Sequence, residues 1–434
     1  MGYLIGVVVF VVGMLASIAL HEVGHMVPAK RFGVRVSQYM VGFGPTLWSR
    51  TRGETEYGLK AIPLGGYVRL VGMYAPGTHA GRAGRLAELA QEARDASAEE
   101  IRPGEEGRAF YHLSAGRKIV VMLGGPFMNL LIALVLMAVL VMGVGSAQAT
   151  TTLDRVVECV PATTAGSCDG GEEPSPAQRA GLVAGDRVVS YGGRAVATWD
   201  ELTAAIAAHG TAPALVTVER DGTTLELTVL PQTLTRTVVD AQGAPVTGED
   251  GAPQTLTSTY VGVAPTVENV RGGVGDVAET LWLQVSGTAK VVATLPGQVW
   301  DVGRTLVTGE ERSQDSVMSI VGVGRVAGEV GSADGDGVTM GDRVVVWVSL
   351  LASLNIALFV FNLIPLLPLD GGHVAGALYE GGRRQLARWR RRSPLPGPAD
   401  TARMMPLAYG VFVALIGVSV VLIVADLVRP VTLG

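Results

Sequence analysis

The chain has 434 residues, of which 48% are hydrophobic and only 17% are charged, whereas a soluble globular protein has about 25% charged residues. This composition excludes a disordered chain and argues against an ordinary cytosolic enzyme. The formal net charge of −5 leaves no basic excess that would suggest binding to nucleic acid. The sequence therefore predicts a membrane protein that also carries polar, folded segments.

Four uncharged apolar stretches are long enough to cross a bilayer as helices, which takes about 20 residues each. They cover residues 3–20, 119–145, 344–369 and 404–425. The first has no basic leader and no cleavage site of small residues, and it runs directly into charged residues, so we interpret it as a span and not as a signal peptide.

The connectors between the spans differ in charge. Residues 26–116 hold 12 Lys and Arg, and residues 371–403 hold seven Arg, whereas residues 146–342 hold 11 Lys and Arg against 25 Asp and Glu. Because cations near span ends favour the cytoplasmic side, we expect both basic connectors in the cytoplasm. The acidic connector and both termini are then expected outside, and the short connector 371–403 carries most of this expectation.

The first span runs into the sequence HEVGH, residues 21–25. His21 and His25 are four residues apart and share one face of a helix, with Glu22 beside them. In the H-E-x-x-H arrangement the two histidines bind Zn²⁺ and the glutamate is the general base. Three ionisable groups in a span cost several kcal/mol each unless they are paired or bind an ion. The alternative is a helix that ends at Leu20, with the motif among the lipid headgroups.

A catalytic zinc needs a third protein ligand and one open position for water. Asp370 closes the third apolar stretch, at the depth where the first one ends. Pro365 and Pro368 break helix geometry there, and the glycines at 371–372 permit a sharp turn. His373 is a rival ligand that spacing does not exclude, and an ordinary interfacial charge is the alternative role for Asp370.

A stretch rich in glycine and aromatic residues lies between positions 38 and 71. The alternation of apolar and polar residues between positions 57 and 68 predicts the strands of a hairpin. A strand edge near the zinc would pair with an unwound substrate, whose scissile carbonyls are hidden while it is helical. The alternative is a simple surface hairpin. Residues 74–108 predict a solvated cytoplasmic helix or a loose loop.

The acidic connector contains a folded segment from about residue 152 to 231, with a hairpin turn at Asp221–Gly222. Cys159 and Cys168 lie in this connector, so an oxidising compartment would allow a disulfide, and two unpaired thiols are the alternative. Residues 270–307 are more helical, and we expect them on the outer membrane surface.

HEVGH on a first span and NLIPLLPLDGG at the end of a later one resemble the motifs of the site-2 protease family, which are intramembrane zinc metallopeptidases. Further stretches are similar to this family in its bacterial, PDZ-containing branch. They are GFGP (42–45), PLGGYV (63–68), GGPFMN (124–129) and SIVGVGRVAG (319–328). One departure is the long, Gly-, Pro- and Thr-rich portion 242–258, to which we assign no role.

The resemblance implies a mainly α polytopic membrane protein with four transmembrane helices, a membrane-reentrant β-hairpin region and an inserted extracytoplasmic α+β PDZ-like domain. It implies one Zn²⁺ held by His21, His25 and Asp370, with Glu22 as the general base. It further implies four substrate-binding residues, which are Asn362, Gly65, Gly66 and Asn129. The predicted ranges of the membrane part are 1–29 for span one, 30–116 for the hairpin region and cytoplasmic loop, 117–145 for span two, 343–372 for span three, 373–403 for a basic cytoplasmic loop and 404–434 for span four with its tail. Between spans two and three we expect the PDZ-like domain at 146–235 and an extracytoplasmic linker with amphipathic helices at 236–342.

The expected activity is cleavage of single-pass membrane proteins in the plasma membrane, with the site near the cytoplasmic side. The resemblance suggests regulated intramembrane proteolysis of an anti-sigma factor after a first cut outside, and a peptide ligand for the PDZ-like domain. Two alternatives remain, which are a membrane scaffold with a structural metal and a zinc peptidase acting on lipidated or soluble peptides at the interface.

Overall fold

The computed structural model describes residues 2–76, 85–160, 173–238, 252–309, 312, 316–332 and 339–429. By its internal contacts the chain divides into two compact units. We call residues 1–143 and 273–433 the membrane unit, and residues 144–272 the β-rich unit. Cys168 and residues 242–251 lie outside the described residues, so the disulfide with Cys159 stays a prediction.

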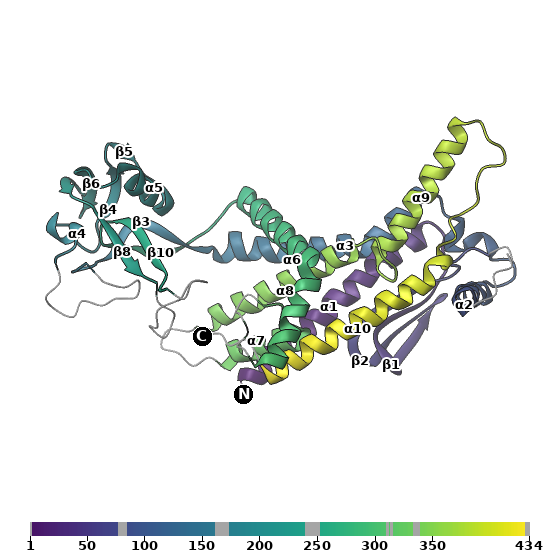
Figure 1. Ribbon diagram of the computed structural model, residues 1–434. Coiled ribbons are helices and arrows are strands. Elements are labelled where there is room, and N and C mark those ends of the chain that lie inside the picture. Colours follow the sequence, from purple (N-terminus) through teal and green to yellow (C-terminus); the bar gives the residue numbers. More distant parts are fainter. Residues whose placement is uncertain are drawn as a thin grey trace. The chain divides into compact units, whose positions relative to one another are not determined.

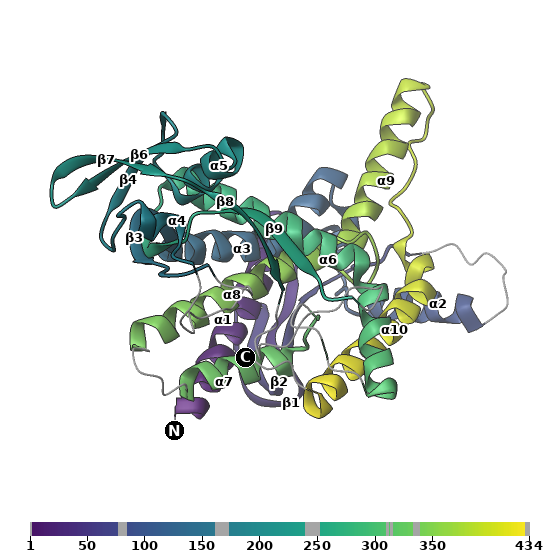
Figure 2. The same ribbon diagram turned by 60° about the vertical axis from the view of Figure 1, so that its left-hand side comes forward.

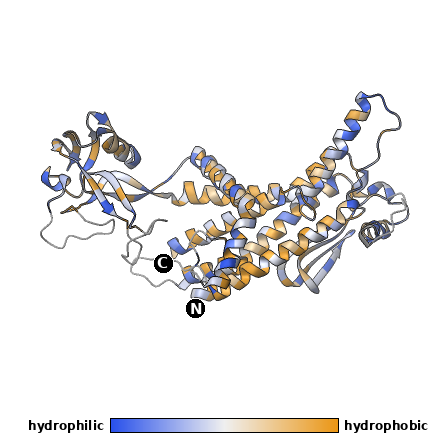
Figure 3. Cartoon of the chain, viewed as in Figure 1, coloured by the Kyte–Doolittle hydropathy of each residue, from blue (hydrophilic) through white to orange (hydrophobic). Residues whose placement is uncertain are grey.

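Four helices of the membrane unit are long and apolar enough to cross a membrane, judged by length and composition. Each overlaps one of the four predicted spans, and orange, hydrophobic residues predominate along the long helices in Figure 3. The helices are α1 (Gly2–Arg31), α3 (Ala115–Ala138, continued by a π-helical turn over Val139–Val144), α8 (Met340–Asn362) and α10 (Met405–Val428, preceded by a 3₁₀ turn over Thr401–Met404). The third predicted span is helical only to Asn362, because Pro365 disfavours helix in the residues before it.

Small residues let the spanning helices approach closely. This is expected in a membrane, where the hydrophobic effect does not drive helices together and close packing has to do so. A Cβ on Gly24 of α1 would overlap the carbonyl oxygen of Gly124 on α3. A Cβ on Gly6 would likewise overlap the carbonyl oxygen of Ala327 on α7 (Ile320–Ser332). Backbones therefore touch where α1 crosses each partner.

Two long strands, β1 (Val36–Arg52) and β2 (Thr55–Leu70), form an antiparallel sheet where alternation predicted hairpin strands. The first half of β1 pairs on both sides, because Tyr39 lies opposite both Tyr57 and Val68. The end of β2, residues 66–70, is thus an outer strand among the described strands. The Tyr39 hydroxyl donates to the Ala19 carbonyl of α1 at 2.7 Å, which fastens this sheet to the first span. Its entry into the membrane stays a prediction.

Three further α-helices belong to the described part of the membrane unit (Figure 1). They are α2 (Arg85–Glu99), α6 (Val274–Thr308) and α9 (Asp370–Trp389). Lys118 of α3 and Glu380 of α9 form a buried ion pair at 2.7 Å, so the helix that begins at Asp370 is fastened to the second span.

The β-rich unit is a mixed helix and sheet domain (Figure 2). Its main sheet has the order β10-β3-β4-β6-β7, with β5 on β4, and a separate pair is formed by β8 and β9. The Asp221–Gly222 turn joins β6 to β7 as predicted, with φ of 49° at Asp221. The strands are β3 (Ser146–Val156), β4 (Arg187–Tyr191), β5 (Arg194–Ala195), β6 (Ala214–Arg220), β7 (Thr223–Val229), β8 (Gln232–Thr237), β9 (Thr255–Tyr260) and β10 (Val263–Val270).

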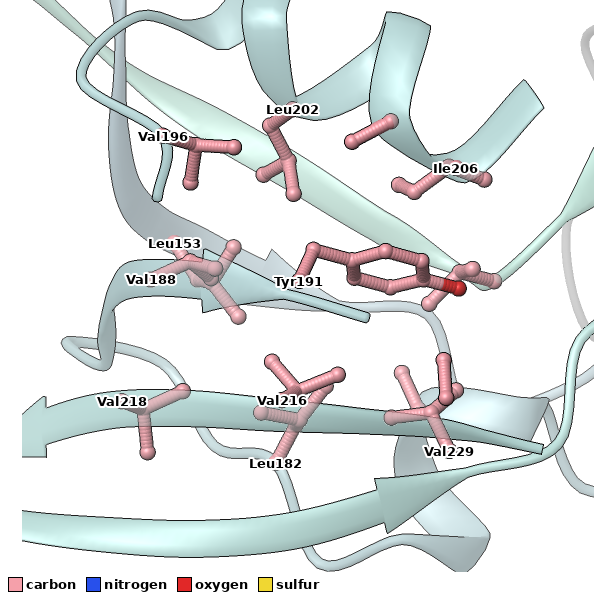
Figure 4. Close-up of a cluster of buried hydrophobic side chains, with 14 residues drawn as sticks. Leu153, Leu182, Val188, Tyr191, Val196, Leu202, Ile206, Val216, Val218 and Val229 are labelled. Atoms are coloured by element: carbon pink, nitrogen blue, oxygen red, sulfur yellow. The ribbon is translucent and has the colours of Figure 1, made fainter. Parts of the chain in front are cut away.

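The core of this unit lies between the sheet and α5 (Trp199–His209), while α4 (Pro176–Arg179) packs nearby. Figure 4 shows Leu202 and Ile206 of α5 facing Val188, Tyr191 and the other buried side chains. A capping box at Thr198 and Glu201 fixes the start of α5 and so directs its apolar face to the sheet. The unit thus has the α+β character that was expected, and its assignment as PDZ-like stays a prediction.

Candidate metal centre

Three predicted ligands from two distant segments come together in the membrane unit. His21 Nε2 lies 3.4 Å and His25 Nε2 lies 3.3 Å from Asp370 Oδ2, and the two Nε2 atoms are 3.2 Å apart. Within the described residues, these side chains form the one group of three or more His, Cys, Asp or Glu that could hold a metal ion. His373, the rival ligand, lies one turn further along α9 and is not part of this group.

The carboxylate of Asp370 indicates what this cluster is built to hold. Its Oδ2 is buried and has no hydrogen-bond partner among the residues that the structure describes. A buried carboxylate oxygen without a donor is costly, and a cation between it and the two imidazole nitrogens would compensate that cost. Two imidazole nitrogens and one carboxylate oxygen are also the ligand set of a catalytic zinc with one open position. The residues present therefore fit a zinc ion.

Helix α3 contacts the Nδ1 atoms of both imidazole rings, on the side away from Asp370. His25 Nδ1 lies 2.8 Å from the backbone carbonyl oxygen of Val121, and His21 Nδ1 lies 3.0 Å from the side-chain amide of Asn129. In metal sites such outer partners fix the tautomer and the orientation of the ring. Both rings consequently present Nε2 to Asp370.

Gly125 is the position at which α3 makes room for the two rings. A Cβ at Gly125 would overlap His25 Nε2 and would lie 2.7 Å from His21 Nε2. Together with the backbone contact between Gly24 and Gly124, this explains the paired glycines of the GGPFMN stretch. Sequence reasoning found that stretch by resemblance alone, although two adjacent glycines inside an apolar span are a signal for close approach.

A folded-back turn places Asp370 at the start of α9. A Cβ at Gly371 would overlap the carbonyl oxygen of Ile364, and one at Gly372 would lie 2.5 Å from the backbone nitrogen of Leu367. The predicted sharp turn is therefore present, and only glycine fits at its two tightest points.

A cavity of about 610 Å³ opens beside the cluster. Glu22 is 9% exposed and lies on its wall, next to the two histidines. The backbone N–H of Val68, in the outer strand of the hairpin sheet, faces the Glu22 carboxylate. Burial, together with the charge of Glu22, raises the pKa of the nearby Tyr39 to about 12, so its hydroxyl remains a donor to Ala19.

The four predicted substrate-binding residues have different surroundings. Asn362 and Gly66 line the cavity, and a Cβ on Gly66 would lie 3.4 Å from Glu22 Cγ. Gly65 has φ of 92° and precedes the lining strand. Asn129 is fully buried against His21 and is not among the residues that line the cavity.

Helix α2 covers part of this cavity, which sequence reasoning missed. Ala93, Ala96 and Ser97 line the cavity, and Arg94 forms an ion pair with Asp400 at 2.8 Å. Ser97 Oγ also accepts a hydrogen bond from the backbone N–H of Tyr74 at 3.1 Å. An alanine-rich polar helix in a connector carries no local signal that it packs against a distant site.

Comparison with known proteins identifies the family of this chain. Residues 9–393 match the model of peptidase family M50. The chain is 35% identical over 443 residues to zinc metalloprotease Rip1 of Mycobacterium tuberculosis strain H37Rv, with both chains covered completely. It is 33% identical to zinc metalloprotease Rip1 of Mycolicibacterium smegmatis, covering 99% of this chain and 98% of the relative. Metalloprotease MmpA of Caulobacter vibrioides is 27% identical, with 87% of each chain covered.

A family match over most of the chain and relatives of full length lead to the same assignment as the paired sequence motifs. Four candidate spans and a cluster that fits zinc accompany this match in the structure. The chain belongs to peptidase family M50, the site-2 protease family, and it is an intramembrane zinc metalloprotease.

Proposed function

We propose that this peptidase cleaves single-pass membrane proteins within or near their spans, with Glu22 as the general base. One observation carries the proposal, namely the convergence of His21, His25 and the unpartnered Asp370 oxygen beside a cavity that also contains Glu22. A base, a metal-binding set and space for a peptide thus share one site.

His21 and His25 would hold zinc through Nε2 and Asp370 through Oδ2. Bound zinc supplies a Lewis acid that polarises a carbonyl and lowers the pKa of a water molecule. Glu22 follows His21 directly in α1, and its carboxylate takes the proton from the attacking water. The same carboxylate then delivers that proton to the amine that leaves.

The substrate strand would lie along residues 66–70. This outer strand lines the cavity, and the N–H of its Val68 faces the carboxylate of Glu22, which lines the same cavity. A helical substrate hides its carbonyls in hydrogen bonds, so pairing with an outer strand supports an extended and cleavable form. Gly66 keeps this strand close to Glu22, and the amide of Asn362 lies on the cavity wall to hold the peptide backbone.

The proposed substrate class follows from the family resemblance. The proposed orientation in the membrane follows from the charge of the connectors. We place both basic connectors and the metal centre on the cytoplasmic side, and the β-rich unit outside, where a PDZ-like domain would bind peptide ends. An anti-sigma factor shortened by a first cut outside is the proposed physiological substrate. The pair of Cys159 and Cys168 would then lie in an oxidising compartment.

Glu22→Gln tests the chemistry. We expect the variant in proteoliposomes to lose cleavage of a spanning substrate by at least about 100-fold, because general base catalysis contributes 10²–10⁴-fold. Zinc content and thermal unfolding should match those of the wild type, since the carboxamide keeps the shape of the side chain. Turnover at the wild-type rate would remove Glu22 from the mechanism.

Two comparisons test the substrate class. A spanning substrate and a short soluble peptide of the same scissile sequence should differ in kcat/KM in favour of the spanning form. Faster cleavage of the soluble peptide would instead favour a peptidase that acts at the interface.

Membrane fragments that accumulate in cells with Glu22→Gln and are absent in cells with the wild type would identify the natural substrate. If no anti-sigma factor fragment differs between the two kinds of cell, that substrate class is excluded.

A further inference from the structure

We propose that Asn129 is a positioning residue that orients His21 for zinc, and not a residue that binds substrate. This inference rests on the proposed role of His21 as a ligand. It starts from the burial of Asn129, whose exposed fraction is 0%, and from its contact with His21 Nδ1 at 3.0 Å.

The chemistry of a neutral imidazole determines what His21 needs from its neighbour. Such a ring has one N–H, and the nitrogen that binds a metal is the one without it. Because Nε2 of His21 faces Asp370 at 3.4 Å, Nδ1 must carry the hydrogen. His21 therefore requires a hydrogen-bond acceptor behind it, as metal-bound histidines generally do.

His25 shows the same arrangement with an unambiguous acceptor. Its Nδ1 lies 2.8 Å from the carbonyl oxygen of Val121, which can only accept. Helices α1 and α3 run in opposite directions along this contact, so His25 meets Val121 and His21 meets Asn129 two turns further along α3. One helix thus supplies the acceptor for both rings.

The side-chain oxygen of Asn129 is free for this role. Asn129 Oδ1 is buried and has no hydrogen-bond partner within the described part of the chain. A half-turn of the amide exchanges its oxygen and nitrogen and places Oδ1 against Nδ1–H of His21. A substrate-binding role would instead require an amide that reaches the cavity, and Asn129 does not line it.

A buried asparagine elsewhere on the spans provides a matched control. Asn355 of α8 is also fully buried, and its Nδ2 donates to Ser17 Oγ at 2.9 Å, one turn before His21 on α1. Both asparagines link α1 to another span, but only Asn129 contacts a proposed ligand. A general packing role would therefore affect the two positions alike.

The test measures zinc affinity of the purified full-length protein by competition with a chelator. Asn129→Leu and the smaller Asn129→Ala should bind zinc about 10–100-fold more weakly, which is the usual effect of losing an outer partner of a ligand. Asn129→Asp keeps an acceptor of the same size and should retain most of the affinity. Asn355→Leu should lower the unfolding temperature while zinc affinity stays at the wild-type value.

Three outcomes would overturn the inference. These are wild-type zinc affinity in both Asn129→Leu and Asn129→Ala, an equal loss in Asn355→Leu, or a raised KM for substrate at unchanged zinc affinity. His21→Ala separates this failure from failure of the ligand assignment. If His21→Ala itself retains wild-type zinc affinity, the proposed ligand set is wrong, whereas its loss beside an unaffected Asn129→Leu rejects the positioning role alone.

Discussion

Two aspartates of the membrane unit, the partly buried Asp370 and the buried Asp426, have opposite surroundings. Asp426 Oδ1 accepts from the Arg312 guanidinium and Oδ2 from the backbone N–H of Ser319, each at 2.6 Å. A Cβ on Gly322 would overlap the Asp426 carboxylate, so α7 packs directly onto it. Asp370 has two imidazole nitrogens beside it, a cavity next to it and an oxygen that accepts no hydrogen bond within the described part of the chain.

This difference distinguishes a carboxylate in a structural role from one in the metal-binding role that we propose. A buried charge in a folded protein is normally paired and hydrogen-bonded, because desolvation otherwise costs several kcal/mol. At Asp426 the protein itself supplies the donors and closes the space around them. At Asp370 it supplies two further electron-pair donors and leaves space, an arrangement that is favourable only when a cation binds.

Replacing Asp370, the proposed zinc ligand, should have the largest effect on activity and little effect on the fold. Asp370→Asn should lower zinc affinity and kcat by more than about 100-fold, since even outer partners of a ligand are worth 10–100-fold. The unfolding temperature of the metal-free protein should not fall, because the replaced oxygen accepts no hydrogen bond from the residues that the structure describes. Zinc stoichiometry, turnover and thermal unfolding check the three expectations.

A large loss of stability in metal-free Asp370→Asn would show that the carboxylate serves the fold, and the contrast with Asp426 would disappear. His21→Ala is the control on the other side of the cluster. It should lose zinc in the same way and should keep the helical content of the wild type.

Replacing the structural aspartate should reverse this pattern. Asp426→Asn leaves the guanidinium of Arg312, whose side chain is 1% exposed, without its counter-charge, which typically costs about 3–5 kcal/mol. Zinc affinity should stay at the wild-type value because Asp426 lies outside the metal cluster. Denaturation in detergent and zinc titration measure the two quantities.

The double variant Asp426→Leu with Arg312→Met should recover most of the lost stability, because an apolar pair removes both buried charges. If instead Asp426→Asn were as stable as the wild type, the pair would contribute nothing to the fold. The burial of Arg312 and Asp426 would then need another explanation.

The contrast also shows which parts of the molecule a sequence can predict. The spans and the histidine pair follow from local patterns, since an uncharged run of 20 residues or a spacing of four is visible in one window. Asp370 could be proposed as a ligand because it ends an apolar run. Only the structure, however, shows that it lies close to His21. The partners Arg312 and Asp426 are 114 residues apart, and nothing local distinguishes Asp426 from a charge that ends a span.

The same limit applies to the surroundings of the metal cluster. The contact between Asn129 and His21, and the covering of the cavity by Ala93 and Ser97 of α2, join segments that are distant in the chain. Their residue types are ordinary for a span and for a polar helix. Resemblance identified Asn129 but assigned it a role in the cavity, because a motif records which residue is present and not which atom it contacts.

Asp186 of the β-rich unit extends the comparison to a carboxylate that accepts hydrogen bonds from three N–H donors. Loss of its charge should have the smallest effect of the three aspartates. The Arg220 guanidinium donates to both oxygens at 2.7 and 2.8 Å, and the backbone N–H of Val183 donates at 2.9 Å. Burial acts to raise the pKa of Asp186, but these hydrogen bonds outweigh it and hold the pKa below its usual range. Hydrogen bonds to a charged group contribute about 1.5–3 kcal/mol.

The sign of the pH dependence follows from this lowered pKa. Since the folded protein holds the proton less tightly than the unfolded chain, the stabilisation is complete above about pH 4 and is lost as the pH falls through the lower, folded value. Protection factors of the β4 and β6 amides, which correct the measured hydrogen exchange for its intrinsic pH dependence, should therefore fall between pH 6 and pH 3 in the wild type. Asp186→Asn should show low protection throughout and a weaker dependence on pH. An unchanged pH dependence in Asp186→Asn would mean that another group titrates, because no charge at residue 186 would then be left to protonate.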